Sequence, residues 1–453
     1  MGNIPSELGN LSNLQSLVLI STGSSGGLTG TIPTEIGFLT RLTDLQVSGK
    51  TLEGTIPTQV GLLSSLTDLE LFSNALTGPI PSEIGQLSSL SLVNIFSNAL
   101  NGRIPTELGL LVGLTQLQMY DNHLTGPLPS QIGHISNVES IILTSNALTG
   151  TIPTEWGFLT GLQVLMLSGN SLMGSIPSQI GHLSNLSTLT FISNVLTGTI
   201  PTEIGLLNNM TMMDLSNNRL TGSIPSELGK TLVLSSLHLF SNTLIGTVPT
   251  ELGMLTGLTD LILYSNALTG PIPSEIGHLS SLNTLYLHGN SLNQQIPTEM
   301  GFLTALTQLT LYYNALPGTI PSEMGHLSNL LMMYLYSNNL IGTIPTEFGS
   351  LASITDLQVH RNSLTGPIPS QLGLLQSLAL LDLADNHLTG TVPTELSNLS
   401  HLFNFAMGGN NVTGSVNVIF CMNHPVVFAT LSVDCSKVNC SCCTQCCVGT
   451  NSC

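Results

Sequence analysis

One spacing constrains this 453-residue chain more than any other feature: a proline recurs every 24 residues from Pro33 to Pro393 without interruption. A period of this length is typical of a solenoid, in which each repeat buries its apolar face only against its neighbours. The chain is therefore predicted to fold as a stack of similar repeats, although its length alone would suggest about three globular domains.

The residues before each proline predict a short strand followed by a polar turn. A representative repeat, Leu114–Pro129, reads L-T-Q-L-Q-M-Y-D-N-H-L-T-G-P-L-P. Leu117 and Met119 are two residues apart, so both point toward the core from an extended segment. An asparagine recurs at one position in fifteen consecutive repeats, from Asn74 to Asn410, and all but the last stand seven residues before the proline. We interpret this asparagine as structural, because a buried amide can satisfy backbone groups of the neighbouring turn.

The residues after each proline predict a short helical turn. Ser or Thr comes first and is usually followed by Glu, as in Pro201-Thr202-Glu203. The hydroxyl is predicted to cap the turn, and the carboxylate suits its first residues.

The pattern L-x-x-L-x-L-x-x-N-x-L followed by Leu-x-Gly-x-Ile-Pro resembles the plant-type leucine-rich repeat. This repeat is found in ectodomains of plant receptor kinases, in receptor-like proteins and in polygalacturonase inhibitors, and the resemblance covers nearly the whole chain. It implies an α/β repeat fold: a right-handed solenoid with a concave parallel β-sheet, a second short flank sheet and 3₁₀ turns on the convex side. One scaffold carries many functions, so the resemblance says less about the ligand.

The two ends of the chain differ. The solenoid is expected to span residues 1–417, and its start inside a repeat, at Asn3-Ile4-Pro5, suggests that sequence is missing upstream. Residues 418–453 are expected to form a C-terminal cap that contains all eight cysteines: Cys421, Cys435, Cys440, Cys442, Cys443, Cys446, Cys447 and Cys453. An even number confined to one segment indicates disulfides made in an oxidising compartment. Zinc is the alternative, because Cys443 and Cys446 have C-x-x-C spacing.

These features predict an extracellular or cell-surface location, as a secreted protein or as an ectodomain whose anchor lies elsewhere. No segment approaches the ~20 consecutive apolar residues of a membrane span. Six Asn-x-Ser/Thr sequences are compatible with a secreted glycoprotein. They begin at Asn10, Asn185, Asn209, Asn398, Asn411 and Asn439.

Charge and motifs argue against nucleic-acid binding and against catalysis. Seven Lys and Arg against 25 Asp and Glu give a net charge of -18, which repels phosphate backbones. The Gly229-Lys230-Thr231 segment lacks the first glycine of a phosphate-binding loop, whose position is Ile224. We therefore expect that the protein is not an enzyme and that it uses no cofactor.

Two periodic features could suggest metals, but neither predicts a site. The residue after each proline alternates between Thr and Ser from Thr58 onward, so the true module has 48 residues. Four histidines occupy one position of the Ser-type repeats, namely His134, His182, His278 and His326. Successive histidines are at least ~10 Å apart, too far for shared coordination. Thirteen glutamates stand two residues after a proline. We interpret each glutamate as stabilising the helical turn that it begins. The alternative is that this column of carboxylates binds calcium.

The candidate binding site is a run of aromatic residues near the strand ends, on the face that the core does not use. We name the nine aromatic residues of this run the aromatic stripe and add the adjacent arginine to the candidate site. The ten residues are Phe240, Tyr264, Tyr286, His288, Tyr312, Tyr313, Tyr334, Tyr336, His360 and Arg361. Stacked aromatics can also stabilise a parallel ladder, but that role does not need a tyrosine hydroxyl, so we favour binding.

The charges around the stripe indicate the kind of ligand. It is bordered by Asp214, Asp260, Asp356, Asp382 and Asp385. This predicts a cationic or neutral partner, namely a protein, a peptide or a neutral glycan that binds on the concave face. The resemblance implies a role in signalling or defence and allows a co-receptor as a further partner. The alternative is an ice-binding or structural surface protein that uses threonines of the flank strand, such as Thr149 and Thr151.

Overall fold

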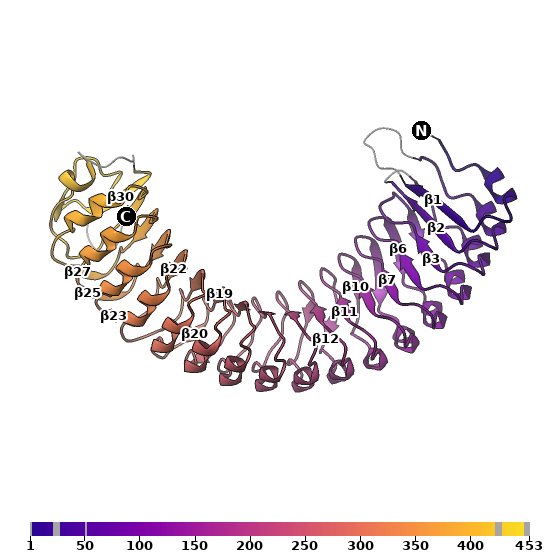
Figure 1. Cartoon of the computed structure of the whole chain (residues 1–453), viewed down its shortest axis with the longest axis horizontal. Coiled ribbons are helices and arrows are strands. Elements are labelled where there is room, and N and C mark those ends of the chain that lie inside the picture. The colour runs from indigo at the N-terminus through magenta and orange to yellow at the C-terminus, as the bar shows by residue number, and fades with distance from the viewer. Residues whose placement is uncertain (1, 21–27, 50–51, 422–427, 448–453) are drawn as a thin grey trace. The chain divides into compact units, whose positions relative to one another are not determined.

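The computed structural model describes residues 2–20, 28–49, 52–421 and 428–447. It divides into two compact units, unit 1 (Met1–Thr221) and unit 2 (Gly222–Cys453). Within each unit the parallel strands lie on one side, which we call the sheet face, and the 3₁₀ turns lie on the other, which we call the turn face (Figure 1). The predicted leucine-rich-repeat architecture is confirmed.

The elements of unit 1 repeat in a fixed order. Its main strands, each paired in parallel with the next, are β1 (Ser16–Ile20), β2 (Asp44–Ser48), β3 (Asp68–Glu70), β5 (Leu92–Asn94), β7 (Gln116–Gln118), β9 (Ser140–Ile142), β11 (Val164–Met166), β13 (Thr188–Thr190) and β15 (Met212–Asp214). Its flank strands are β4 (Thr77–Pro79), β6 (Ala99–Arg103), β8 (His123–Pro127), β10 (Ala147–Thr149), β12 (Met173–Gly174) and β14 (Val195–Leu196). Its turns are η1 (Ser6–Asn10), η2 (Thr34–Phe38), η3 (Thr58–Leu62), η4 (Ser82–Gln86), η5 (Thr106–Leu110), η6 (Ser130–His134), η7 (Thr154–Phe158), η8 (Ser178–His182) and η9 (Thr202–Leu206).

Unit 2 has the same order and ends in the cysteine-rich segment. Its main strands are β16 (Ser236–His238), β17 (Asp260–Ile262), β19 (Thr284–Tyr286), β21 (Gln308–Thr310), β22 (Met332–Tyr334), β24 (Asp356–Gln358), β26 (Leu380–Asp382), β28 (Asn404–Ala406), β30 (Thr430–Asp434) and β32 (Gln445–Cys447). Its flank strands are β18 (Thr269–Gly270), β20 (Ser291–Leu292), β23 (Ile341–Gly342), β25 (Ser363–Pro367), β27 (His387–Thr389), β29 (Gly414–Ser415) and β31 (Val438–Asn439). Its 3₁₀ turns are η10 (Ser226–Lys230), η11 (Thr250–Met254), η12 (Ser274–His278), η13 (Thr298–Phe302), η14 (Ser322–His326), η15 (Thr346–Ser350), η16 (Ser370–Leu374) and η17 (Thr394–Asn398), and η18 (Asn417–Cys421) is a π-helix.

The core is a ladder of leucines in register. Leu261 pairs with Leu285, and Leu285 pairs with Leu309 in the next repeat, so equivalent residues lie side by side. All three have no exposed surface. Full burial of one such side chain stabilises the fold by ~2 kcal/mol, so the stack is held together mainly by contacts between neighbouring repeats.

The repeated asparagines are structural, as predicted. In Asn122 the side-chain nitrogen donates to the carbonyl oxygens of Ile95, one repeat earlier, and of Met119, at 3.1 and 3.2 Å. Its side-chain oxygen accepts from the backbone nitrogen of Leu100 at 3.0 Å. One buried amide therefore ties two repeats together at the bend after each strand.

The predicted hydroxyl cap of the turns is wrong. The N-cap residue is the proline, for example Pro105, and η5 has no side-chain cap hydrogen bond. The hydroxyl of Thr106 instead donates to the carboxylate of Glu107 at 3.2 Å. The physical reason is that the proline, fixed in an extended conformation, supplies the backbone carbonyl that Leu108 uses to close the turn.

The turns also pack closely enough to need glycine. A Cβ on Gly181 would lie 2.4 Å from the carbonyl oxygen of Glu203 in the next repeat. This explains why a glycine stands near the middle of most turns.

The flank strands do not form a continuous threonine surface. In the register of β8 and β10, Thr149 lies beside Pro127, and in that of β25 and β27, Thr389 lies beside Pro367. Prolines thus interrupt the threonine column on which the ice-binding alternative depends.

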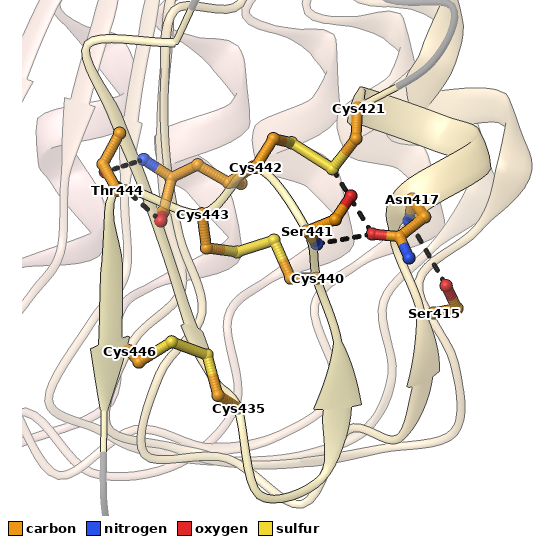
Figure 2. Close-up of a disulfide and its surroundings, with 11 residues drawn as sticks. Ser415, Asn417, Cys421, Cys435, Cys440, Ser441, Cys442, Cys443, Thr444 and Cys446 are labelled. Atoms are coloured by element: carbon orange, nitrogen blue, oxygen red, sulfur yellow. Dashed lines mark hydrogen bonds between the residues drawn. A yellow bond between two sulfur atoms is a disulfide. The ribbon is translucent and has the colours of Figure 1, made fainter.

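The C-terminal segment continues the main sheet and is cross-linked by disulfides (Figure 2). Strand β30 pairs with β28, and three disulfides join Cys421 to Cys442, Cys435 to Cys446 and Cys440 to Cys443. The sulfurs of Cys421, Cys440 and Cys442 lie within 4.8 Å of one another, but all three are oxidised, and zinc binds thiolates. The side chains of the predicted cap cysteines Cys447 and Cys453 lie outside the described residues. Among the described residues, no helix is long and apolar enough to span a membrane.

Candidate functional site

The structure places the predicted site residues together on the sheet face of unit 2. Six rings, from Phe240, Tyr264, His288, Tyr312, Tyr336 and His360, follow the ends of successive strands and form one stack. Ring centroids are 4.6, 4.4, 4.2, 4.4 and 4.3 Å apart along this series, and the ring planes differ by 10 to 15°. The inner faces of the stack are occupied by neighbouring rings, so a ligand lying along the stripe would meet ring edges and tyrosine hydroxyls.

The hydroxyls of Tyr312 and Tyr336 within the stack are protonated. The two rings lie 4.4 Å apart. Partial burial raises the pKa of both phenols above the ordinary value, and the neighbouring phenol of Tyr312 raises that of Tyr336 further. The stripe therefore offers neutral groups that can both donate and accept hydrogen bonds.

A second layer of tyrosines stands two residues earlier, at the ends of β19 and β22. Tyr286 is tilted against Tyr264 at 6.5 Å and donates a hydrogen bond to Gln308. Tyr334 is tilted against Tyr312 at 6.4 Å. Burial and the nearby carboxylate of Asp356 raise the pKa of Tyr334 to about 12. Both phenols are therefore also neutral at physiological pH.

His288 is held in the stack as an uncharged ring. Its Nδ1 lies 2.7 Å from the hydroxyl of Thr310, and burial lowers the pKa of the imidazole to about 4. A neutral ring stacks between Tyr264 and Tyr312 without introducing a buried cation. The sequence did not identify Gln308 or Thr310 as supports of the stripe, although both stand one repeat after the ring that they contact.

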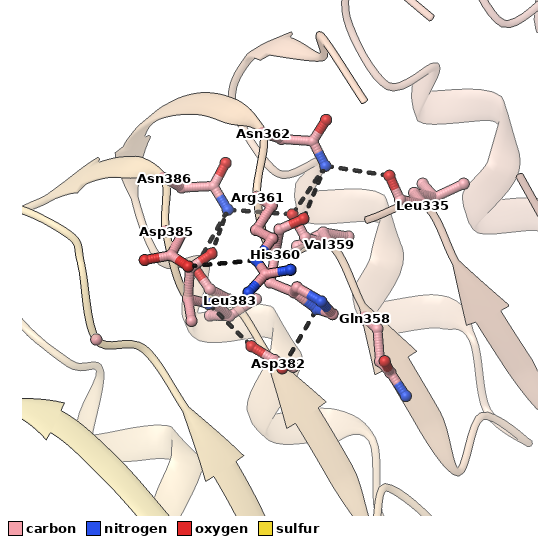
Figure 3. A network of polar contacts seen from close by, with 12 residues as sticks. Leu335, Gln358, Val359, His360, Arg361, Asn362, Asp382, Leu383, Asp385 and Asn386 are labelled. Carbon is pink, nitrogen blue, oxygen red and sulfur yellow. Dashed lines mark hydrogen bonds and ion pairs between the residues drawn. The ribbon is translucent and has the colours of Figure 1, made fainter. Parts of the chain in front are cut away.

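The C-terminal end of the stack carries a polar network (Figure 3). Nδ1 of His360 lies 3.2 Å from a carboxylate oxygen of Asp382, in a contact whose geometry is not that of a hydrogen bond. Burial lowers the pKa of His360, and Asp382 offsets part of this effect. Nε of Arg361 lies 3.7 Å from Asp385. The one cation of the candidate site is thus already paired, which leaves little free positive charge for an anionic ligand.

Tyr313 adopts a backbone conformation that disfavours its side chain. Its φ is +52°, in the left-handed region, and the same position is serine in several other repeats, as at Ser265 and Ser337. The ring meets Tyr312 and Tyr336 edge-on at 5.4 and 5.6 Å, and 54% of the residue remains exposed. A bulky residue held in this conformation at a surface is the kind of strain that accumulates at binding sites.

The border of acidic residues is only partly as predicted. Asp356 and Asp385 are partly or largely accessible, but Asp214 is buried and accepts hydrogen bonds from the backbone and the hydroxyl of Ser216. Asp214 therefore stabilises a turn in unit 1 and does not contribute surface charge. Its position at the end of a strand could not distinguish these roles, because Asp382 occupies the same place in its own repeat.

Unit 1 has a shorter stack that serves as an internal comparison. The rings of Phe72, Phe96 and Tyr120 lie 4.9 and 4.3 Å apart. Stacking at this position is thus compatible with the fold elsewhere, but only unit 2 adds the second tyrosine layer and Tyr313 among the described residues.

Comparisons with known proteins agree with the repeat fold. The Leucine Rich Repeat family model matches residues 161–183, 209–231 and 377–399. No curated protein matches the chain. The solved structure of the Arabidopsis receptor kinase HAESA, in complex with the peptide hormone IDA and the co-receptor SERK1, is 32% identical over 96% of this chain and 72% of that chain, with a TM-score of 0.88.

Two further plant receptors are similar. The plant peptide hormone receptor RGFR1, in complex with RGF2, is 30% identical over 96% of this chain and 81% of that chain, with a TM-score of 0.64. The ectodomain of GASSHO1/SCHENGEN3 from Arabidopsis thaliana, in complex with CASPARIAN STRIP INTEGRITY FACTOR 2, is 33% identical over 98% of this chain, with a TM-score of 0.71. The chain spans 61% of that ectodomain. The chain belongs to the leucine-rich-repeat family, and its fold is similar to that of plant receptor kinase ectodomains.

Proposed function

We propose that this chain is an extracellular recognition module that binds a protein, peptide or neutral glycan through the aromatic stripe on the sheet face of unit 2. The observation that carries the proposal is Tyr313, an exposed aromatic side chain in a left-handed conformation, at a position where other repeats have serine, glycine, aspartate, asparagine or arginine. Folding does not need this side chain, so ligand contact is the simplest reason for it.

The charge and hydrogen-bonding character of the stripe support a neutral or cationic ligand. Tyr286, Tyr334 and Tyr336 are neutral phenols, Asp356 lies beside Tyr334, and Arg361 is paired. HAESA and RGFR1 were solved with peptide hormones, and HAESA also with a co-receptor. By this likeness we propose a peptide as the first class to test, a role in signalling or defence, and a co-receptor as a further partner.

The remaining parts of the proposal concern the whole chain. We propose that it acts by binding and not as an enzyme, that it functions outside the cell or at the cell surface, and that residues 418–453 form a cap on the solenoid of residues 1–417. Three disulfides between described cysteines support the oxidising location and the cap. The ice-binding alternative is not favoured, since Pro127 and Pro367 interrupt the threonine surface.

The test is a selection followed by matched variants. Ligands are first selected on the wild-type chain, as peptides from a random display library and as hits from an array of neutral oligosaccharides. Their affinities are then compared between wild type and the double variant Tyr312→Ala/Tyr336→Ala. Loss of two central aromatic contacts should weaken binding at least tenfold. The control is Phe96→Ala/Tyr120→Ala, which removes two stacked rings of the same geometry from unit 1. Equal binding by the two double variants would contradict the proposal.

A further inference from the structure

The turn face carries a second patterned surface, apart from the candidate site. In a 3₁₀ turn, residues three apart lie on the same side. Glu107 and Leu110 of η5 are so related, and the same pair recurs two and four repeats later as Glu155 with Phe158 in η7 and Glu203 with Leu206 in η9. We name these six residues the turn-face ridge.

The apolar members of the ridge are not needed by the fold. Leu110, Phe158 and Leu206 are 65%, 66% and 55% exposed. The intervening turns η6 and η8 place His134 and His182 at the equivalent position, also exposed. The same backbone site therefore accepts a polar residue, and large apolar residues exposed there indicate a surface that a partner buries.

The spacing of the ridge fits a regular partner. Paired strands are ~4.8 Å apart, and in unit 1 the turns lie on the outer side of the curved stack (Figure 1), so two repeats advance the ridge by ~9.6 Å or more. One heptad of an α-helix rises by ~10.5 Å, so a helix with one apolar position per heptad could contact each ridge residue in turn. The carboxylates of Glu107, Glu155 and Glu203 recur at the same interval beside the apolar row. Their only side-chain hydrogen bonds among those observed come from the preceding threonines, at 3.2 to 3.3 Å.

We propose that the turn-face ridge of unit 1 docks a basic amphipathic α-helix of a partner protein, with its apolar stripe on Leu110, Phe158 and Leu206 and its lysines or arginines toward the glutamates. A second copy of this chain is a poor occupant, because its net charge of -18 opposes self-association. An anionic membrane is disfavoured for the same reason. The proposal is independent of ligand binding on the sheet face.

The probe is a labelled 21-residue helical peptide with leucines on one face and lysines beside them, measured by fluorescence anisotropy. The comparison peptide has the same composition in an order that spreads the leucines around the helix. Wild-type protein should bind the amphipathic peptide at least tenfold more tightly than the comparison peptide. The triple variant Leu110→His, Phe158→His, Leu206→His introduces residues that the intervening turns already accommodate, and it should remove this preference.

Two controls separate the ridge from general effects. Val112 is 58% exposed but lies outside the ridge, so Val112→His should bind like wild type. The triple variant Glu107→Gln, Glu155→Gln, Glu203→Gln should weaken binding at low salt and approach wild type at high salt. Equal affinity for both peptides, or an undiminished preference in the histidine variant, would overturn the proposal. So would a wild-type dimer in sedimentation that the histidine variant abolishes, or a ridge-dependent attachment to lipid vesicles without peptide binding.

Discussion

Replacing Tyr313 with glycine should separate binding from stability. The residue has φ of +52°, and Gly289 occupies the equivalent position one repeat earlier with φ of +63°. The variant Tyr313→Gly thus keeps a backbone conformation that the chain already uses with glycine. It removes an exposed ring and leaves the stack of six rings complete.

The change in stability follows from three opposing contributions. A left-handed conformation costs a residue with a side chain ~1 to 2 kcal/mol, and glycine removes this cost. The edge-on contacts of Tyr313 with Tyr312 and Tyr336 would be worth ~0.5 to 1.5 kcal/mol each if buried, and are weaker here because 54% of the residue is exposed. Glycine also adds ~0.4 to 1 kcal/mol of unfolded-state entropy. The free energy of unfolding should therefore stay within about 1 kcal/mol of wild type.

The assay pairs urea unfolding, followed by circular dichroism, with affinity for the peptides or oligosaccharides enriched on the wild-type chain. Binding should fall at least tenfold, while the unfolding midpoint hardly moves. Ser337→Gly, at the same position one repeat later with φ of +53°, is the matched control; it should leave affinity unchanged and raise the free energy of unfolding by no more than about 1.5 kcal/mol. A loss of more than about 2 kcal/mol would show that Tyr313 is structural, and unchanged affinity would refute its role as a ligand contact.

Three further predictions concern the scaffold. The pKa of His288 is lowered to about 4 in the folded protein, so the unfolded chain takes up the proton more readily, and the free energy of unfolding should fall as pH drops from about 6.5 to about 4. His288→Phe should lose less of this free energy than wild type, as measured by urea titrations at pH 7 and 4.5. Asn338→Ala should lower the free energy of unfolding by about 3 kcal/mol, because the buried amide makes hydrogen bonds to the backbone of Leu311, Leu335 and Leu316. The control Asn329→Ala loses one exposed hydrogen bond to Thr304 and should lower it by less than about 1 kcal/mol in the same assay. Peptide mapping of unreduced secreted protein should recover Cys421–Cys442, Cys435–Cys446 and Cys440–Cys443 without bound zinc; free thiols at these positions would overturn both the pairing and the oxidising location.

The repeat architecture could be predicted because each structural requirement recurs in every repeat. Leu261 and Leu285 lie in register because equivalent residues of stacked repeats must share one core, and this shows in the sequence as a fixed period. The asparagine role was predictable for a similar reason, since a polar side chain at a buried bend needs backbone partners. The turn cap was not predictable from residue preferences, because Thr106 prefers a capping role in isolation while Pro105 already supplies the carbonyl that closes the turn.

The candidate site was predictable as a row of residues but not in its geometry. The strand spacing places Tyr312 beside Tyr336, but whether their rings stack or splay depends on side-chain torsions that periodicity does not determine. The strain at Tyr313 had a sequence signal, because no other repeat has an aromatic residue at this position, yet the sign of φ needed the structure. The pairing of Arg361 with Asp385 likewise depends on two adjacent bends.

The two proposed surfaces differ in a way that bears on their partners. The turn-face ridge repeats with the 48-residue module, so it presents the same pair of groups at equal intervals, as in Glu107 with Leu110 and Glu155 with Phe158. A regular surface is best matched by a partner with its own regular repeat, such as an α-helix. The aromatic stripe does not follow the module: aromatic rings occupy both types of repeat in unit 2, and Tyr313 occurs in one repeat alone. A surface whose positions differ from one repeat to the next can discriminate among ligands group by group, which is what a specific recognition site requires.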